Sequence, residues 1–143
     1  MKETRQHAEA ETIAFIRRGY ELWNDDDVDG LARQILSEDV FFQTPPDWPG
    51  QSTYRGREEV ARFLREEVAA VIELGDIEIE RIDVVGEEYV IRMLARTRVQ
   101  DSGLDIGKIP FFHVAHVRDG RVDRIRSFLD ERQAFAAVRH EAG

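Results

Sequence analysis

The sequence contains no cysteine, and this absence excludes disulfide bonds, thiolate metal sites and cysteine nucleophiles. It also has no run that approaches the roughly 20 apolar residues of a membrane span, and its first residues lack the apolar segment of a signal peptide. We therefore expect a cytoplasmic protein that does not have a membrane as a partner.

Basic residues are in the minority. The 20 Lys and Arg residues are outnumbered by 29 Asp and Glu residues, which gives a net charge of −9. Proteins bind phosphates of nucleic acids through clustered basic side chains, so nucleic acid is not an expected partner. The sequence also lacks glycine-rich phosphate loops, dinucleotide fingerprints and the G-x-S-x-G nucleophile motif, and no cofactor is therefore expected.

What is present is typical of one globular domain. The chain has 143 residues, of which 42% are hydrophobic and 34% are charged, and this suits a single domain over 1–143 with one sizeable core. Apolar residues at three- and four-residue spacing predict helices, and alternating apolar residues predict strands. The expected helices cover 8–24, 28–36, 57–74 with Gly75 as a C-cap, and 131–140; the expected strands cover 40–44, 77–85, 88–100 and the two arms of a hairpin within 105–130. This order predicts an α+β fold in which helices pack on one face of a curved, mostly antiparallel sheet and enclose a pocket.

The hairpin is the clearest element, because two extended runs flank a single Asp119-Gly120 turn signal. A three-residue loop that starts at Arg118, with Gly120 left-handed in a G1 bulge, pairs odd positions with odd positions. One face of the hairpin is then apolar except for one imidazole and one hydroxyl, which suits the lining of a ligand pocket. This face consists of Ile109, Phe111, His113, Ala115, Val117, Ile125, Ser127 and Leu129.

Three strands and one loop supply the predicted ligand-binding residues. In the strand over 88–100, Met93 and Ala95 alternate with Arg92 and Arg96, so we expect the apolar side to face the pocket. The loop after the first strand carries two aromatic residues in a polar, turn-rich segment, where such a side chain either covers a pocket or fills the edge of a core. The predicted ligand-binding set is Phe42, Thr44, Trp48, Tyr54, Met93, Ala95, Phe111, Ile125, Ser127 and Leu129.

His113 is the candidate catalytic residue, because it faces the pocket and imidazole titrates near neutral pH. The alternative is a partly buried histidine whose ring is satisfied by a neighbouring hydroxyl or carbonyl. Ser127, on the same face of the adjoining strand, either orients this ring or is a small residue chosen for packing. Asp130 ends the last strand, and it either caps the terminal helix or reaches the mouth of the pocket.

No metal site is expected. His113 is the inward-facing histidine, whereas His116 faces the opposite way and His7 and His140 lie near the ends of the chain. The acidic run over 25–27 lacks the spacing of an EF-hand, and we expect it to cap the short helix that follows.

Several short motifs, taken in order, carry a resemblance to a known family. They are W-N-D-D-D-V-D-G-L over 23–31, S-E-D-V-F over 37–41 followed by Pro45, Y-R-G-R-E-E-V over 54–60, V-R-D-G-R-V over 117–122 and F-L-D over 128–130. With this order and spacing the chain resembles, over residues 13–135, the nuclear transport factor 2-like (NTF2-like) superfamily, and within it the SnoaL-like group. The resemblance implies a cone-shaped fold that hosts isomerases, polyketide cyclases, epoxide hydrolases, dehydratases, binding modules and dimerisation modules.

Two catalytic sets of related enzymes are broken at the positions that the resemblance implies. For ketosteroid isomerases, the tyrosine donor falls on Gly19, the carboxylate base on Thr44 and the protonated acid on about His113. For limonene-epoxide-type hydrolases, the Asp-Arg-Asp set falls on Arg96, Arg98 and Ser127. A polyketide-cyclase site requires one acid/base group beside an enolisable ligand, and His113 meets that requirement.

The expected function is the binding of a small, largely apolar carbonyl compound, polyketide- or steroid-like, in the pocket. As an enzyme, the protein would be a cofactor-independent isomerase or cyclase that uses His113; the alternatives are a non-catalytic ligand-binding module and a dimerisation module. A homodimer is expected through the sheet face opposite the pocket, where an apolar cluster is rimmed by arginines. This cluster consists of Phe112, Val114, Val122 and Phe128.

Overall fold

The computed structural model of the protein describes residues 2–46, 48, 51–68, 72–99 and 104–142. Along the chain, its elements are α1 (Lys2–Asn24), α2 (Val28–Gln34), β1 (Leu36–Gln43), β2 (Thr53–Arg55), α3 (Arg57–Phe63), a π-helical turn (Leu64–Val68), β3 (Ile72–Val85), β4 (Glu88–Val99), β5 (Leu104–Arg118), β6 (Arg121–Phe128) and α5 (Glu131–Ala142).

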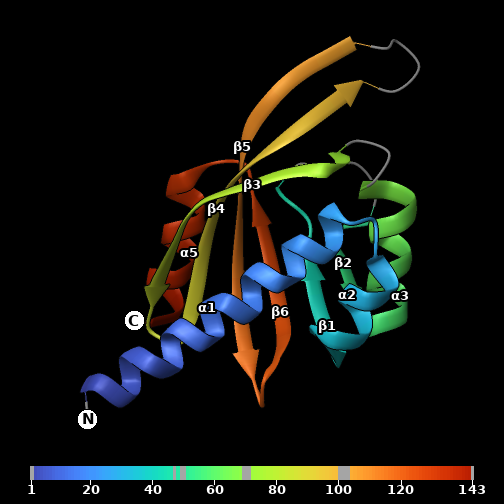
Figure 1. The fold of residues 1–143 in the computed structure, drawn as a ribbon. Helices are drawn as coiled ribbons and strands as arrows, with labels where there is room; N and C mark the ends of the chain where they lie inside the picture. Colours follow the sequence, from blue (N-terminus) through green and yellow to red (C-terminus); the bar gives the residue numbers. More distant parts are fainter. Residues whose placement is uncertain (1, 47, 49–50, 69–71, 100–103, 143) are drawn as a thin grey trace.

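The strands form one sheet in the order β2-β1-β6-β5-β4-β3. Strands β1 and β6 run parallel, and the other described neighbours are antiparallel. Helices α1, α2 and α3 lie on one side of this sheet and α5 lies on the other (Figure 1). The predicted α+β fold with a mostly antiparallel sheet is confirmed, and the difference is that the terminal helix covers the opposite face from the other helices.

The hairpin of β5 and β6 has the expected pairing but a different turn. Odd positions pair with odd positions, for example His113 with Ser127. The connection, however, is a two-residue turn in which Asp119 (φ 53°) and Gly120 (φ 74°) both adopt left-handed backbone angles. The expected three-residue loop is therefore wrong. The pairing of odd with odd positions arises further along the hairpin, because Asp123 of β6 is a bulge residue without a partner and shifts the register by one residue.

The helix expected over 57–74 is confirmed as helical to Val68 and is wrong at its end. α3 ends at Phe63, the π-helical turn follows, and β3 already begins at Ile72. Gly75, the expected C-cap, lies inside β3, and residues 69–71 lie outside the described residues. The spacing of apolar residues in this segment fits a helix, but β3 pairs with β4 over most of its length, and this long-range pairing overrides the local pattern.

The main core lies between the sheet and the helices α1, α2 and α3. Met93 and Ala95 of β4 are almost completely buried in it, whereas Arg92 forms ion pairs on the other side with Glu80 and Glu131. The expected alternation along β4 is therefore confirmed. The capping of α2 is confirmed as well, because the carboxylate of Asp27 accepts a hydrogen bond from a backbone N–H in the first turn.

A second, smaller core lies under α5 on the outer face of the sheet. Phe112, Val114 and Phe128 are buried there against α5, and the fourth residue of the expected dimer cluster, Val122, belongs to the main core on the opposite side. The apolar surface on which the dimer expectation was based is therefore covered within the chain itself. The homodimer stays a prediction, but that cluster cannot supply its interface while α5 is in place.

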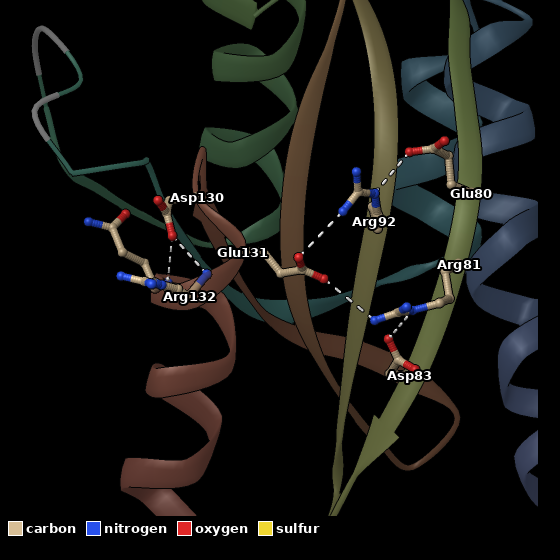
Figure 2. Close-up of polar contacts among 8 residues, drawn as sticks. Glu80, Arg81, Asp83, Arg92, Asp130, Glu131 and Arg132 are labelled. Atoms are coloured by element: carbon tan, nitrogen blue, oxygen red, sulfur yellow. Dashed lines mark hydrogen bonds and ion pairs between the residues drawn. The ribbon is translucent and has the colours of Figure 1, made fainter.

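The start of α5 is fixed by polar contacts (Figure 2). The carboxylate of Asp130 accepts hydrogen bonds from two backbone N–H groups of the first turn, including that of Arg132 at 2.7 Å. Of the two alternatives for Asp130, helix capping is confirmed. Glu131 also lies 3.5 Å from both Arg81 and Arg92, which links α5 to β3 and β4. Separately, none of the described helices combines the length and the apolar character needed to cross a membrane.

Candidate functional site

A cavity of about 100 Å³ lies between the sheet and the layer formed by α1, α2 and α3. Its wall is almost entirely apolar, because the inward faces of the amphipathic helices and of the alternating strands meet there. Aromatic and aliphatic side chains from α1, β1, the π-helical turn, β3, β4, β5 and β6 all contribute. A mostly apolar cavity with few polar groups is typical of a small-molecule site.

Most of the residues predicted from the sequence meet in this cavity. The candidate His113 lines it, and so do both residues expected beside it on the hairpin, Phe111 and Ser127. The aromatic Trp48, from the loop after β1, also reaches the wall. The predicted residues that line the cavity are Phe42, Trp48, Met93, Phe111, His113, Ile125 and Ser127.

Four predicted residues lie elsewhere. Leu129 follows the last residue of β6 and is 49% exposed, because the chain has already left the strand and the alternation no longer applies. Ala95 is buried in the main core beside the cavity but not on its wall. Thr44 is buried too, and its hydroxyl donates a hydrogen bond to the carbonyl of Ser52 at 3.1 Å. Its side chain therefore fixes the loop and does not line the cavity.

Tyr54 is the fourth of these residues. Its ring stacks on Phe63 with 4.1 Å between centroids, and its hydroxyl donates to the carboxylate of Glu67 at 2.8 Å. Burial and the neighbouring Glu67 carboxylate raise the pKa of Tyr54 to about 12. Of the two alternatives for this loop aromatic, the structure therefore supports packing at the edge of the core, where Tyr54 holds β2 against α3 and the π-helical turn.

The polar centre of the cavity is a pair formed by Tyr20 of α1 and His113 of β5. The Tyr20 hydroxyl lies 2.7 Å from Nδ1 of His113. The two rings also stack, with centroids 5.9 Å apart, and Phe42 and Phe111 meet the imidazole edge-on at 6.0 and 5.4 Å. The other ring nitrogen, Nε2, has no hydrogen-bond partner among the described residues and is not one of the fully buried atoms. The imidazole is thus held on three sides and has one free polar atom.

Burial determines the charge state of this pair. It lowers the pKa of His113 from 6.5 to about 4, because the imidazolium is poorly solvated in an apolar surrounding. Burial also raises the pKa of Tyr20, since the phenolate is disfavoured for the same reason. At neutral pH the pair is therefore a phenol hydrogen-bonded to a neutral imidazole.

The sequence did not identify Tyr20 as a functional residue. It lies on the apolar stripe of the helix expected over 8–24, which predicts only that its ring faces the core, and the resemblance to ketosteroid isomerases implies a tyrosine donor one position earlier, at Gly19. The structure shows that Gly19 only lines the cavity and that the neighbouring tyrosine supplies the hydroxyl. The available signal was chemical, because a buried tyrosine hydroxyl requires a hydrogen-bond partner.

Two further polar groups of the wall have no hydrogen-bond partner among the described residues. They are the hydroxyl of Ser127 and the indole Nε1 of Trp23, and both residues are buried. One of the two sequence-based alternatives was that Ser127 orients the ring of His113. The structure shows instead that Tyr20 orients this ring. Next to Trp23, the side-chain amide of Asn24 fixes the edge strand by donating to the carbonyl of Ile77 at 2.9 Å and accepting from its N–H at 3.0 Å.

The described residues contain no group of three or more His, Cys, Asp or Glu side chains arranged to hold a metal ion. His116, which the sequence placed on the outer face, pairs with Asp123 at 2.6 Å and takes no part in the cavity. The chemistry that the site offers is therefore that of a neutral phenol and imidazole in an apolar cavity.

Comparison with known proteins agrees with this architecture. Residues 16–125 match the family model of the SnoaL-like domain. No curated protein sequence matches the chain. Among solved structures, the chain is similar to an NTF2-like protein of unknown function from Burkholderia pseudomallei (22% identity, 89% of this chain and 94% of the other, TM-score 0.68). It is also similar to a protein from Jannaschia sp. CCS1 provisionally named a SnoaL-like polyketide cyclase (17% identity, 90% and 92%, TM-score 0.69) and to TerC co-crystallised with polyporic acid (18% identity, 89% and 97%, TM-score 0.67). The family match covers most of the chain, including the helices and strands that build the cavity, and the protein therefore belongs to the SnoaL-like domain family of the NTF2-like superfamily.

Proposed function

We propose that the protein binds a small, neutral, largely apolar carbonyl compound in the cavity, with the carbonyl oxygen at the Tyr20–His113 pair. The observation that carries this proposal is the pair itself, a hydrogen-bonded phenol and imidazole with one free ring nitrogen inside a largely apolar wall. The fold hosts several activities, so the residues of the site, and not the fold, distinguish between them.

The wall favours an uncharged ligand. No Asp, Glu, Lys or Arg lines the part of the cavity that the structure describes. Burial of a carboxylate or ammonium group without an opposite charge nearby is strongly disfavoured. A charged ligand would therefore have to carry its own counter-charge into the cavity. A ketone or aldehyde oxygen, by contrast, requires one donor, and the pair provides it.

The donor follows from the tautomer. When the Tyr20 hydroxyl donates to Nδ1 of His113, the ring proton of the neutral imidazole lies on Nε2, and this N–H is free to donate to a carbonyl oxygen. Because the pKa of His113 is about 4, the ring holds this neutral form throughout the physiological range. The pair is thus a fixed single donor in a low-dielectric surrounding, where hydrogen bonds are stronger than in water.

The cavity favours a smaller ligand than the polyketide or steroid expected from the sequence. Its volume is about 100 Å³, whereas pockets for drug-sized ligands measure roughly 300–1,000 Å³ and a cavity of about 150 Å³ holds benzene. One small ring is therefore the upper limit for the part of the ligand inside the cavity, and any larger part would extend out of it. That TerC, a structural neighbour, was co-crystallised with polyporic acid supports small-molecule binding on this fold.

Proton transfer is a second candidate function, favoured by the free Nε2 atom. In the other tautomer of His113, the proton is on Nδ1 and Nδ1–H donates to the hydroxyl oxygen of Tyr20. The Tyr20 O–H then donates to the carbonyl oxygen of the ligand. Nε2 of His113 takes the proton from the carbon atom beside that carbonyl. The products are an enolate, whose oxygen accepts a hydrogen bond from Tyr20, and an imidazolium ring. A pKa of about 4 makes His113 a weak base for this step, which is why binding is the first proposal and catalysis the second.

The test uses the two tryptophans, because Trp23 and Trp48 are the only tryptophans of the sequence and both line the cavity. Their indole N–H signals in a ¹H–¹⁵N spectrum of the full chain are followed while cyclohexanone is added. We expect saturable shifts of both signals, and binding at least about fivefold weaker in His113→Phe, since the donor is lost. Methylenecyclohexane, which has the same ring without the oxygen, is the matched control ligand. Absence of saturation with cyclohexanone, or equal affinity for the hydrocarbon, would refute the proposal.

A further inference from the structure

The hydroxyl of Ser127 is a buried polar group that the folded chain leaves unused. Ser127 is 1% exposed and lines the cavity, and its Oγ has no hydrogen-bond partner among the described residues. Leaving a buried hydroxyl unpaired destabilises a protein, so native structures rarely contain one without a partner from outside the chain. The hydroxyl therefore indicates a ligand atom or a water molecule in the cavity next to it.

The sheet register places this hydroxyl beside the Tyr20–His113 pair. Ser127 of β6 is directly opposite His113 of β5, and side chains that face each other across such a pair have Cβ atoms about 4.5–5.5 Å apart. The two do not bond to each other, since Oγ of Ser127 has no hydrogen-bond partner among the described residues and Nδ1 of His113 is paired with Tyr20. One wall of the cavity thus offers two separate polar points, Nε2 of His113 and Oγ of Ser127, side by side.

Packing alone does not explain the serine. An alanine would fill the same space between its neighbours without burying a hydroxyl, so the oxygen adds a cost and no volume that the wall requires. Thr44 gives the contrast within the same protein. Its hydroxyl is also buried, but it lies off the cavity and donates to the carbonyl of Ser52. The buried hydroxyl of Thr44, which lies off the cavity, thus has a hydrogen-bond partner within the chain, whereas the buried hydroxyl of Ser127, on the cavity wall, has none among the described residues.

We propose that Ser127 is a specificity-determining residue that hydrogen-bonds a second oxygen of the ligand, so that the ligand is a hydroxyketone or dicarbonyl whose oxygens lie on adjacent or next-but-one carbons of one ring. The inference rests on the proposed function, because the first oxygen is the one held by Tyr20 and His113. A hydroxyl can donate or accept, so both a ligand hydroxyl and a second carbonyl satisfy it. Because His113 and Ser127 are opposite each other in the register, with Cβ atoms about 4.5–5.5 Å apart in such pairs, a ligand with oxygens on adjacent or next-but-one carbons can reach both residues.

The test compares two probes that differ by one hydroxyl, cyclohexanone and 2-hydroxycyclohexanone, in the same indole titration of the full chain. The parent protein is expected to bind the hydroxyketone about threefold to tenfold more tightly, the scale of one net hydrogen bond. In Ser127→Ala this preference is expected to disappear, while the Kd for cyclohexanone stays within about twofold. Thr44→Val, which removes a buried hydroxyl off the cavity, is the matched control and should keep the preference.

A second readout does not depend on binding. Removing an unpaired buried hydroxyl is expected to raise the Tm of Ser127→Ala in the absence of ligand by about 2–4 °C. If cyclohexanone binds but the parent shows no preference, or Ser127→Ala retains it, the inference is overturned and the proposed function stands. If neither ketone binds, both fail. A lower Tm in Ser127→Ala, with the preference unchanged, assigns the hydroxyl to a structural water and also overturns the inference.

Discussion

The burial of His113 predicts a loss of stability in mild acid. Its pKa is about 4 in the folded protein and 6.5 when the ring is exposed in the unfolded chain. Between these two values the unfolded chain binds the proton and the folded chain does not, so lowering the pH from 6.5 toward 4 favours unfolding. Above pH 6.5 both states are neutral at this position, and His113 contributes nothing to the pH dependence.

The magnitude follows from the width of that window. Each pH unit over which the two states differ by one proton changes the free energy of unfolding by about 1.4 kcal/mol. From 6.5 to about 4 the total is about 3 kcal/mol, a large part of the roughly 5–15 kcal/mol that stabilises a typical domain. Carboxylates titrate at the lower end of the same range, so the parent protein alone does not isolate the effect of one histidine.

The variant His113→Phe isolates it. Phenylalanine keeps a ring in the apolar cavity and cannot take a proton, while the loss of a partner for Tyr20 is the same at every pH and cancels in the comparison. The assay is urea unfolding followed by tryptophan fluorescence at pH 7.5, 6.5, 5.5 and 4.5. We expect the stability of the parent relative to the variant to fall by about 2–3 kcal/mol across this series, with most of the fall below pH 6.5. Parallel curves for the two proteins would show that the imidazole is not desolvated as the cavity requires, and would refute the reasoning.

Three further predictions concern the same site. Tyr20→Phe leaves Nδ1 of His113 without its partner, and we expect a loss of about 1–3 kcal/mol in unfolding free energy together with weaker cyclohexanone binding. Unchanged values in both urea unfolding and the indole titration would contradict the hydrogen bond between Tyr20 and His113. Asn24→Ala removes both hydrogen bonds to the backbone of Ile77, and about 1–3 kcal/mol of stability should be lost in the same unfolding assay; faster hydrogen exchange confined to β3 would identify the cause, and protection equal to the parent would argue against it. If the protein transfers protons, it should exchange the α-protons of cyclohexanone for deuterium in D₂O about 10²–10⁴-fold faster than His113→Gln does; equal rates measured by proton NMR would leave binding as the function.

The sequence determined most of the secondary structure and the direction of the side chains along the strands. Alternation over β4 and over the hairpin placed Met93, Phe111, His113 and Ser127 on the inner face, and the structure has all of them on the cavity wall. This was possible because the period of two in a strand is a property of the backbone and does not depend on what packs against it. The cap at Asp130 was also within reach of local reasoning, since a helix N-terminus requires an acceptor nearby.

Only the tertiary structure decided the rest. The apolar spacing of segment 72–75 is typical of the end of a helix, yet the segment forms a strand because it pairs with β4, where the partner of Ile72 is Thr97, 25 residues further along the chain. The apolar outer face of the hairpin reads as a dimer surface, but α5 folds back to cover it, and nothing in the local pattern specifies which apolar surface a terminal helix will choose.

The candidate site shows the same division. His113 was found from its place on a strand, whereas its partner Tyr20 lies 93 positions earlier in the chain, on a helix whose stripe predicts only that the ring is buried. The packing of α1 across the sheet brings the hydroxyl to the imidazole, and burial by both layers then lowers the pKa of that ring. Sequence fixes which groups face inward along each element, while contacts between distant elements decide which of those groups meet, because the docking of one element on another depends on the shapes of both surfaces together.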